Sequence, residues 1–230
     1  MRGHGTLAAH AGQPVEPDRN CGLCPRLSAF REVQRAAHPD WFNAPVPTFG
    51  KPDARLLIVG LAPGLRGANR TGRPFTGDYA GDLLYDTMID YGFARGTYRA
   101  DPADGLELVD AAITNAVRCV PPENKPTNDE INTCRRFFAA TLAGFSRLSA
   151  IIALGKIAHD QTLKTLGVPL VRHKFGHGAV HALEGLPGVR LYDSYHCSRY
   201  NTNTGVLTPE MFRAVFAAVR RDLWAGSESR

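Results

Sequence analysis

The sequence has no long apolar run. No stretch approaches the roughly 20 apolar residues that cross a bilayer, and the opening residues MRGHGTLAAHAG lack the apolar centre of a secretory signal. We therefore expect a cytoplasmic protein of bacterial or archaeal type, with no membrane partner. Lysine is scarce beside arginine, and the net charge of +5 favours an anionic partner. A solvated arginine-rich surface explains the same composition about as well.

Two common phosphate-binding motifs are also missing from the glycine-rich segment 60–78, which reads GLAPGLRGANRTGRPFTGD. A nucleotide-hydrolase loop needs a lysine where the chain has Asn-Arg-Thr at 69–71, and the dinucleotide pattern GxGxxG does not occur there. The segment follows the apolar run 56–59 and leads into a helical pattern. A buried strand that ends in such a loop is a usual place for a binding site in α/β proteins, and its glycines suit close approach of an anionic ligand.

Apolar strands alternate with helical patterns along the chain. We expect strands at 56–59, 111–117, 150–154 and 189–195, and helices at 25–37, 82–91, from 127 or 128 onward, 156–166 and 209–224. The alternation predicts an α/β fold, a three-layer α/β/α sandwich around a central four-stranded, mainly parallel sheet. With 230 residues and 43% hydrophobic content, we expect a flexible leader over 1–19 and a single domain over 20–226, acting as a monomer.

Four of the five cysteines form a candidate metal site. Cys21 and Cys24 make a CxxC pair, and Cys119 and Cys134 follow a strand and lie on the next helix. In a cytosolic chain such a pair indicates metal or redox chemistry, and four thiolates suit either zinc or a [4Fe–4S] cluster. The spacing does not choose between them, and a redox CxxC with buried structural thiols is the weaker alternative. Cys197, in a polar loop after another strand, stays outside the quartet.

Three motifs at strand ends resemble one known family. They are GLAPGLRGANRTGRPFTGD at 60–78, TNAVRCVPPENKP at 114–126 and YHCSRYNTNTG at 195–205. In this order, and together with the four cysteines, they resemble the uracil-DNA glycosylase superfamily, and most of all its iron–sulfur family 5, the b-type. The resemblance runs from Cys21 to the final helix. It implies a structural [4Fe–4S] cluster held by Cys21, Cys24, Cys119 and Cys134.

The resemblance also implies an activity, hydrolysis of the N-glycosidic bond of uracil in single- or double-stranded DNA, which leaves an abasic site. Hypoxanthine, xanthine and ethenocytosine are implied as further substrates. The base must first leave the stack, because its bond to the sugar is unreachable inside a duplex. Phe75 would then stack on the base, Asn115 would read its edge, and His196 would stabilise the departing anion. The implied base-binding residues are Gly60, Leu61, Ala62, Phe75, Asn115 and His196.

Contacts with DNA are expected from the same loops. Arg199 or Tyr200 would fill the space that the flipped nucleotide leaves, while arginines and backbone amides hold phosphates. A second basic group at 172–174 is equally well explained as a solvated turn. The expected DNA-binding residues are Arg70, Arg73, Ser198, Arg199, Tyr200 and Asn201.

The sequence departs from better-known relatives just after the first strand. Where other superfamily members carry an acid or an amide, this chain has Leu61 and Ala62, which cannot handle a proton. The nearest carboxylate is Asp78, so we expect it to join Asn115 and His196 as a catalytic residue, by positioning water or stabilising a cationic sugar. Asp78 could instead cap the following helix. Cys197 replaces a proline that the family more often has, which favours a more mobile loop.

Two other functions compete with hydrolysis. No lysine stands at a matched position to form a Schiff base, so we expect a monofunctional enzyme. The first alternative is a non-turnover or covalent uracil-DNA binder of the same fold, although the chain lacks the basic insertion of such relatives. The second is a zinc-stabilised nucleotide-binding domain without a role in repair.

Overall fold

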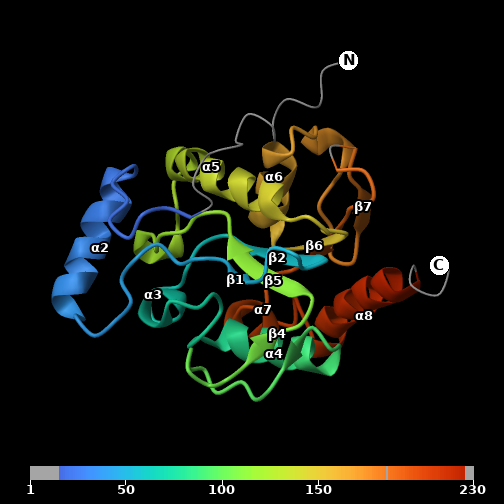
Figure 1. Cartoon of the computed structure of the whole chain (residues 1–230), viewed down its shortest axis with the longest axis horizontal. Coiled ribbons are helices and arrows are strands. Elements are labelled where there is room, and N and C mark those ends of the chain that lie inside the picture. The colour runs from blue at the N-terminus through green and yellow to red at the C-terminus, as the bar shows by residue number, and fades with distance from the viewer. Residues whose placement is uncertain (1–15, 185, 226–230) are drawn as a thin grey trace.

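A six-stranded sheet organises the molecule. The computed structural model describes residues 16–184 and 186–225, in which the strands lie in the order β1-β5-β2-β6-β8-β7 (Figure 1). The four central strands are mutually parallel and coincide with the four predicted ones: β2 (Leu56–Gly60), β5 (Ala111–Asn115), β6 (Ala150–Leu154) and β8 (Arg190–Ser194). Short antiparallel strands, β1 (Phe49–Gly50) and β7 (Val180–Ala182), extend the two edges and bring the total to six.

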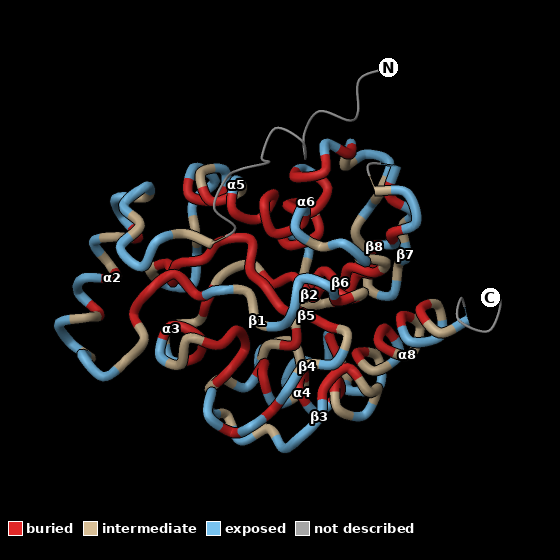
Figure 2. The backbone as a smooth tube through the Cα atoms, in the orientation of Figure 1, coloured by how far each residue is buried: buried red, intermediate tan, exposed pale blue. Residues whose placement is uncertain are grey.

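Helices cover both faces of the sheet, which confirms the predicted α/β/α fold. Leu56 and Ile58 of β2 pack with α4 (Tyr79–Asp90) and α8 (Pro209–Ala225). Their neighbours Leu57 and Val59 point the other way, toward α5 (Asn128–Gly144) and α6 (Lys156–Thr165). The central strands are buried almost throughout (Figure 2). Because both faces are covered, β2 and β6 are almost continuously apolar rather than alternating, whereas β5 and β8 also carry buried polar residues near their carboxyl ends.

Capping residues fix where the long helices begin. Thr127 accepts a hydrogen bond from the Glu130 amide, and the Glu130 side chain accepts one from the Thr127 amide, so α5 begins with a complete capping box. Glu130 also accepts two hydrogen bonds from Arg26 of α2 (Pro25–Ala37), which joins these two helices. Helix α4 begins three residues earlier than predicted, because Asp78 caps it.

A buried polar cluster holds α6, β8 and β7 together. His159 donates from Nδ1 to Asp193 Oδ1 at 2.7 Å and from Nε2 to the His173 carbonyl at 2.8 Å. His181 of β7 donates from Nε2 to Asp193 Oδ2 at 2.9 Å. His159 and Asp193 are fully buried. Both ring nitrogens of His159 therefore act as donors, which makes the His159–Asp193 contact a buried ion pair.

Several short elements lie outside the sequence prediction. Helix α7 (Arg199–Asn203) lies within the motif at 195–205, where no helix was expected, and α3 (Ala68–Thr71) lies inside the glycine-rich segment. The remaining elements are β3 (Ala94–Arg95), β4 (Glu107–Leu108), and the 3-10 turns Pro122–Asn124 and Leu170–Arg172. Most of the expected leader, residues 1–15, is outside the described residues, as is residue 226. Among the described helices, none is long and apolar enough to cross a membrane.

Candidate active site and cysteine pocket

One pocket lies where the parallel strands end. Gly60 of β2 and Asn115 of β5 are paired in register, and His196 follows β8 by two residues. The carboxyl ends of parallel strands meet at one edge of a sheet, so three distant motifs converge there. We call this cavity of about 900 Å³ the strand-end pocket; the predicted residues lining it are Leu61, Ala62, Phe75, Asp78, Asn115, His196, Ser198 and Arg199.

Gly60 packs closely behind two residues that line this pocket, Phe75 and Asn115. A Cβ at Gly60 would collide with Asn115 Oδ1 and would lie 2.8 Å from Phe75 Cζ. Phe75 adopts a positive φ of 53°, which an aromatic residue rarely does. Its ring lies 5.9 Å from the ring of His196, centroid to centroid. Glycine at position 60 thus lets the amide and the aromatic ring share one small space.

Asn115 presents an unused polar atom. Its side chain is 3% exposed, and its Oδ1 has no hydrogen-bond partner among the described residues. Leaving a buried acceptor unpaired costs about 1–3 kcal/mol, so such an atom in a pocket indicates a ligand that completes it. The structure therefore places a ready acceptor for an N–H group at the end of β5.

His196 is held in the pocket as a neutral side chain. Burial lowers the pKa of its imidazole from the usual 6.5, so the ring is uncharged at neutral pH. The His196 carbonyl accepts a hydrogen bond of 2.8 Å from Asn201 Nδ2. Ser198 caps the short helix α7 by accepting from the Asn201 amide. Ser198 and Asn201 thus hold the segment that carries the histidine.

Asp78 is the N-cap of α4 and also lines the strand-end pocket. Its Oδ1 accepts a hydrogen bond of 3.3 Å from the Gly81 amide as the N-cap of α4. Its Oδ2 faces Gly64 and Gly67, and a Cβ on Gly67 would collide with it. Burial raises the pKa of the Asp78 carboxyl above its usual 3.8. One carboxylate thus caps a helix and forms part of the pocket wall.

Arg73 is the one predicted DNA contact that the structure places elsewhere. It is 5% exposed and forms a two-pronged ion pair with Asp104, with both N–O distances at 2.8 Å. Its guanidinium also packs over the rings of Tyr85 and Tyr98. The fold therefore uses this arginine internally, because a side chain paired and buried in this way is not accessible to a phosphate. Its guanidinium holds the pKa of the Asp104 carboxyl well below the usual range.

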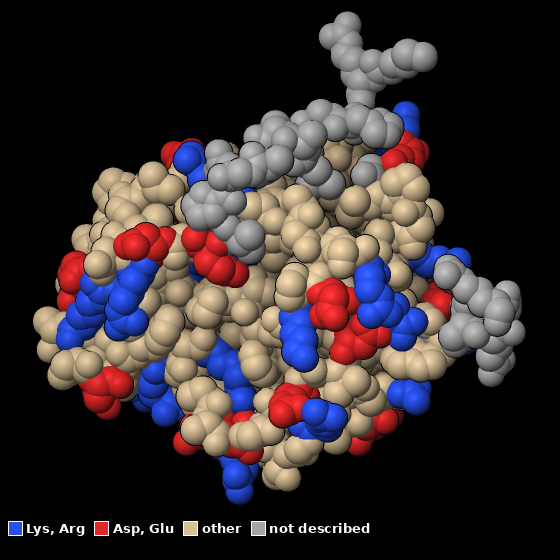
Figure 3. All heavy atoms as spheres, viewed as in Figure 1, with Lys and Arg blue, Asp and Glu red and all other residues tan. Residues whose placement is uncertain are grey.

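The other predicted DNA contacts lie near the pocket rim. Arg70 and Arg199 are exposed, and Tyr200 on α7 is 74% exposed. The Arg199 guanidinium lies 5.1 Å from the Tyr79 ring. On the face seen in Figure 3, basic and acidic side chains are interspersed rather than separated. The basic group at 172–174 does not line the pocket, and Arg172 pairs with Glu184 at 2.9 Å.

Among the pocket-lining residues that sequence reasoning missed, three have polar side chains. Arg66 and Tyr79 lie in or beside the glycine-rich segment, and Asn124 comes from the turn that follows β5. The positions of Arg66 and Tyr79 within or next to the motif were a usable signal. Asn124 lies inside the motif at 114–126, which was a signal of the same kind, but its approach to the pocket depends on the course of a proline-rich loop.

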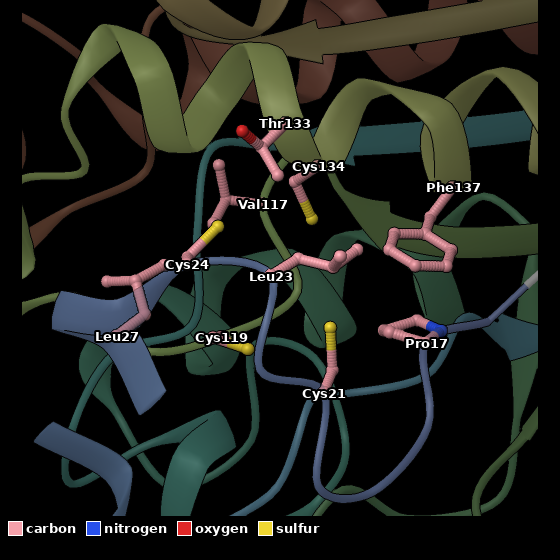
Figure 4. A pocket seen from close by; sticks show the side chains of 10 residues that line it. All are labelled: Pro17, Cys21, Leu23, Cys24, Leu27, Val117, Cys119, Thr133, Cys134 and Phe137. Carbon is pink, nitrogen blue, oxygen red and sulfur yellow. The ribbon is translucent and has the colours of Figure 1, made fainter. Parts of the chain in front are cut away.

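The four cysteines converge on a second, apolar pocket. Cys21 precedes α2, Cys24 is its N-cap, Cys119 follows β5, and Cys134 lies on α5. Figure 4 shows the four sulfur atoms around one space. All four are free thiols. The surrounding side chains of this cysteine pocket are Leu23, Leu27, Val117 and Phe137. Segments from three parts of the chain thus meet at the cysteines.

The spacing of the sulfurs is wide for a single ion. A tetrahedral zinc with bonds of about 2.3 Å draws its sulfurs to within roughly 3.8 Å of each other. In the described part of the chain, only His159, His181 and Asp193 are close enough to hold one ion, within 4.8 Å of one another. No three of the cysteine sulfurs lie within this distance of one another, so the thiols are not gathered as closely as the ligands of one bound zinc ion.

The surroundings of the thiols favour their neutral form. Burial, together with neighbouring thiolates, raises the pKa of Cys24 to about 11 and that of Cys119 to about 12. The Arg118 amide donates to Cys134 Sγ at 3.3 Å, and Arg31 donates to Cys119 Sγ at 3.6 Å. Cys119 and Cys134 are buried, so their thiolate forms would need positive charge nearby, and the Arg31 guanidinium supplies part of it.

Cys197 lies apart from the cysteine pocket. Its side chain is fully buried, packs in the core beneath α4, and donates a hydrogen bond of 3.4 Å to the Ala80 carbonyl. Burial raises the pKa of this thiol well above its usual value. Cys197 thus packs the loop that follows β8 against the core.

The fold and the strand-end pocket define a member of a known class. Residues 47–220 match the model of the uracil DNA glycosylase superfamily, and the chain belongs to this superfamily. It is similar to proteins named type-5 uracil-DNA glycosylase from Thermus thermophilus (45% identity over 87% of this chain and 93% of the relative) and Mycobacterium leprae (43%; 87% and 90%). A third, from Pyrobaculum aerophilum, is 38% identical over 88% and 89%. The resemblance found in the motifs is confirmed.

Proposed function

We propose that the protein is a monofunctional uracil-DNA glycosylase that releases uracil from DNA in base-excision repair. The observation that carries this proposal is the unpartnered, buried Asn115 Oδ1 beside Phe75 and His196, in a pocket at the strand ends. The names of the three relatives support the same activity. We further propose that it acts as a monomer on the DNA in the cytoplasm of the cell.

The pocket residues match the chemistry of a flipped uracil. Asn115 Oδ1 accepts the N3–H of the base, which satisfies the atom that the protein leaves unpaired. Phe75 stacks against the ring face. Gly60 keeps the space for both groups open.

Cleavage then rests on stabilising the departing base. As the C1′–N1 bond breaks, its electron pair moves onto the base and spreads to O2, where neutral His196 donates a hydrogen bond. Water adds to C1′ and loses a proton, which leaves an abasic sugar. Asp78, as a carboxylate, orients this water or stabilises the positive charge on the sugar.

Hydrolysis is favoured over a covalent mechanism. No lysine is among the described residues that line the strand-end pocket, so a Schiff base has no obvious nucleophile. The alternative, a binder that does not turn over, predicts at most one uracil released per protein molecule. The test is free uracil release at substrate excess, with Asn115→Ala and His196→Ala each expected to lower kcat/KM about 10²- to 10³-fold. Release limited to one equivalent would overturn the proposal.

The loop after His196 supplies the proposed contacts with the DNA minor groove. Tyr200 is the better wedge for the vacated space, because it is 74% exposed whereas Arg199 lies over the Tyr79 ring. Arg70 and Arg199 would hold phosphates, and Ser198 and Asn201 would position the loop.

Leu61 and Ala62 also suggest a broader range of bases. They line the strand-end pocket without a charge or hydrogen-bonding group of their own. We propose hypoxanthine, xanthine and ethenocytosine as additional substrates. A panel of oligonucleotides that each carry one damaged base tests this, and turnover of uracil alone would exclude the broader range.

We also propose that the cysteine pocket holds a [4Fe–4S] cluster on Cys21, Cys24, Cys119 and Cys134. The four free thiols, their wide spacing and the N–H donors to sulfur fit such a group. When bound, the cluster would cross-link three distant segments rather than take part in base excision. This assignment is tested by measuring the iron and sulfide contents of the protein and its absorbance at about 400 nm.

A further inference from the structure

A second hollow opens beside the strand-end pocket. It has a volume of about 480 Å³ and is lined by His38, Trp41, Arg66, Arg70 and Gly77. Arg66 and Gly77 line the strand-end pocket as well, so the two cavities adjoin. We call this space the Trp41 hollow. His38 and Trp41 precede the segment 47–220 that matches the superfamily model, whereas Arg66, Arg70 and Gly77 lie within it.

The indole of Trp41 is held firmly in place. It stacks on His38 with the ring centroids 3.9 Å apart and the planes within 9°. The next two residues are tied to α3, since the Phe42 amide donates to the Arg70 carbonyl and the Asn43 amide to the Asn69 carbonyl, each at 3.0 Å. The indole is therefore prearranged beside the arginines, which reduces the entropic cost of stacking a ligand on it.

The Trp41 hollow carries two positive charges that have no acidic partner among the described residues. Arg66 and Arg70 are exposed, and neither forms an ion pair within the described residues. At Gly77, a side chain would press on the Arg70 guanidinium at 2.5 Å, so glycine makes room for it. Arg70 Nε donates to the Arg66 carbonyl at 2.9 Å, which leaves its terminal nitrogens for a ligand. Two guanidinium groups without an acidic partner among the described residues, beside an aromatic ring, fit a nucleotide, with its phosphate on the arginines and its base on the ring.

An acidic boundary limits what the hollow can hold. On the far side of Trp41 and Arg70 lies another cavity, of about 420 Å³, whose lining includes Asp40 and Asp101. A phosphate would be repelled there. The favourable space is therefore confined between the strand-end pocket and Trp41, which suits about one nucleotide.

We propose that the Trp41 hollow binds the nucleotide next to the flipped one, with its base stacked on Trp41 and its phosphate on Arg66 and Arg70. This rests on the proposed function, because it places uracil in the adjoining pocket. In a duplex the neighbouring base is paired and stacked in the helix, so it cannot reach the indole. The hollow therefore favours single-stranded or locally opened DNA over intact duplex.

Binding of a product analogue tests the subsite without requiring catalysis. The probe is a short oligonucleotide with tetrahydrofuran in place of the uracil nucleoside, used single-stranded and in duplex. Trp41→Ala should weaken binding of the single strand about tenfold and leave duplex binding within about twofold, because stacking on one aromatic residue is worth about 1–3 kcal/mol. Trp41→Phe should restore most of the affinity. Removing the neighbouring base on the bound side of the probe should weaken its binding to the wild type. It should not weaken binding to Trp41→Ala any further.

Controls separate this result from loss of fold or of function. Arg147→Ala removes an exposed arginine just before β6, at the amino end of the strands, and should bind both probes as the wild type does. Arg66→Ala and Arg70→Ala should each lower the affinity for the single strand. Each should also make that affinity less dependent on salt concentration. Equal affinity of Trp41→Ala and the wild type, equal losses on both probes, or no binding of either probe would overturn the subsite. Absence of uracil release by the wild type, with these binding differences intact, would overturn only the glycosylase activity.

Discussion

At the scale of single residues, Asp78 combines two tasks in one carboxylate. Oδ1 caps α4, while Oδ2 faces the glycines of the pocket wall. Asparagine can accept the same capping hydrogen bond but carries no charge. Substituting Asp78 by asparagine therefore separates a structural role from a chemical one.

The pH profile of Asp78→Asn provides a sharp test. Burial raises the pKa of Asp78 above 3.8, and if its carboxylate is required, activity is complete above that pKa and falls as the pH falls through it. We expect Asp78→Asn to lower kcat about 10²- to 10³-fold, to remove this acid limb, and to leave the melting temperature nearly unchanged. An acid limb that persists in the variant would assign it to another group, and a large fall in melting temperature would make the cap the main role.

Gly60 offers a second test at this scale. In Gly60→Ala the new methyl group would meet Asn115 and Phe75, so uracil release should fall by about 100-fold or more while the fold is retained. Gly144→Ala is the matched control, because a Cβ there meets nothing within 4 Å at the end of α5. Steady-state uracil release and circular dichroism measure the two effects. Full activity of Gly60→Ala would show that the pocket can relax around the methyl group.

Arg70 and Arg73 show where prediction from the sequence ends at the residue scale. Both are arginines of one glycine-rich loop, so the sequence predicts the same DNA contact for each. Arg73 differs because Asp104, which lies in a segment without clear periodicity, folds back onto it. An ion pair between residues so distant in the chain leaves no local pattern, whereas the positions of Asn115 and His196 follow from the strands that precede them.

At the scale of elements, the His159–Asp193 pair joins α6 to β8 just before His196. Burial acts to lower the pKa of His159, but the hydrogen bond and charge of Asp193 outweigh it, and the pKa rises above 6.5. A group with a raised pKa in the folded state stabilises the fold fully below pH 6.5, and that contribution is lost as the pH rises through the folded pKa.

Urea denaturation of Asp193→Asn tests this pair. Leaving His159 without its partner should cost about 3–5 kcal/mol in the free energy of unfolding near pH 6. The wild type should lose stability as the pH rises from 6.5 through the raised pKa of His159, and the variant should lose less over the same range. An equal pH dependence in the two proteins would show that His159 is neutral in the fold.

The sequence predicts the long elements because their signals are local. Residues 150–154 form a strand and residues 25–37 a helix at the predicted bounds, where apolar runs and a helix-starting proline mark them. The two-residue strand β1 and the three-residue β7 are too short to show a period, and they form only by pairing with distant strands. This is why the sheet has six strands rather than the four visible in the sequence.

At the scale of the whole molecule, the cysteine pocket joins α2, the loop after β5 and α5. Cys134→Ser should abolish the absorbance near about 400 nm and lower the melting temperature, because a bound cluster contributes to folding directly. Cys197→Ser is the matched control, since its thiol is equally buried but lies in another part of the core. Iron content should fall only in the first variant. Iron retained by Cys134→Ser would remove this residue from the ligand set.

The short path between the two pockets has a consequence for the cell. Asn115 and Cys119 are four positions apart in the chain, and the intervening backbone continues the ladder, with the Ala116 and Val117 amides donating to the carbonyls of Gly60 and Leu61. With the proposed cluster bound, loss of its iron would release the backbone that continues from Asn115, the residue that we propose to contact the base. The supply of iron, and the oxidants that consume it, would then set how much working enzyme guards the genome against cytosine deamination.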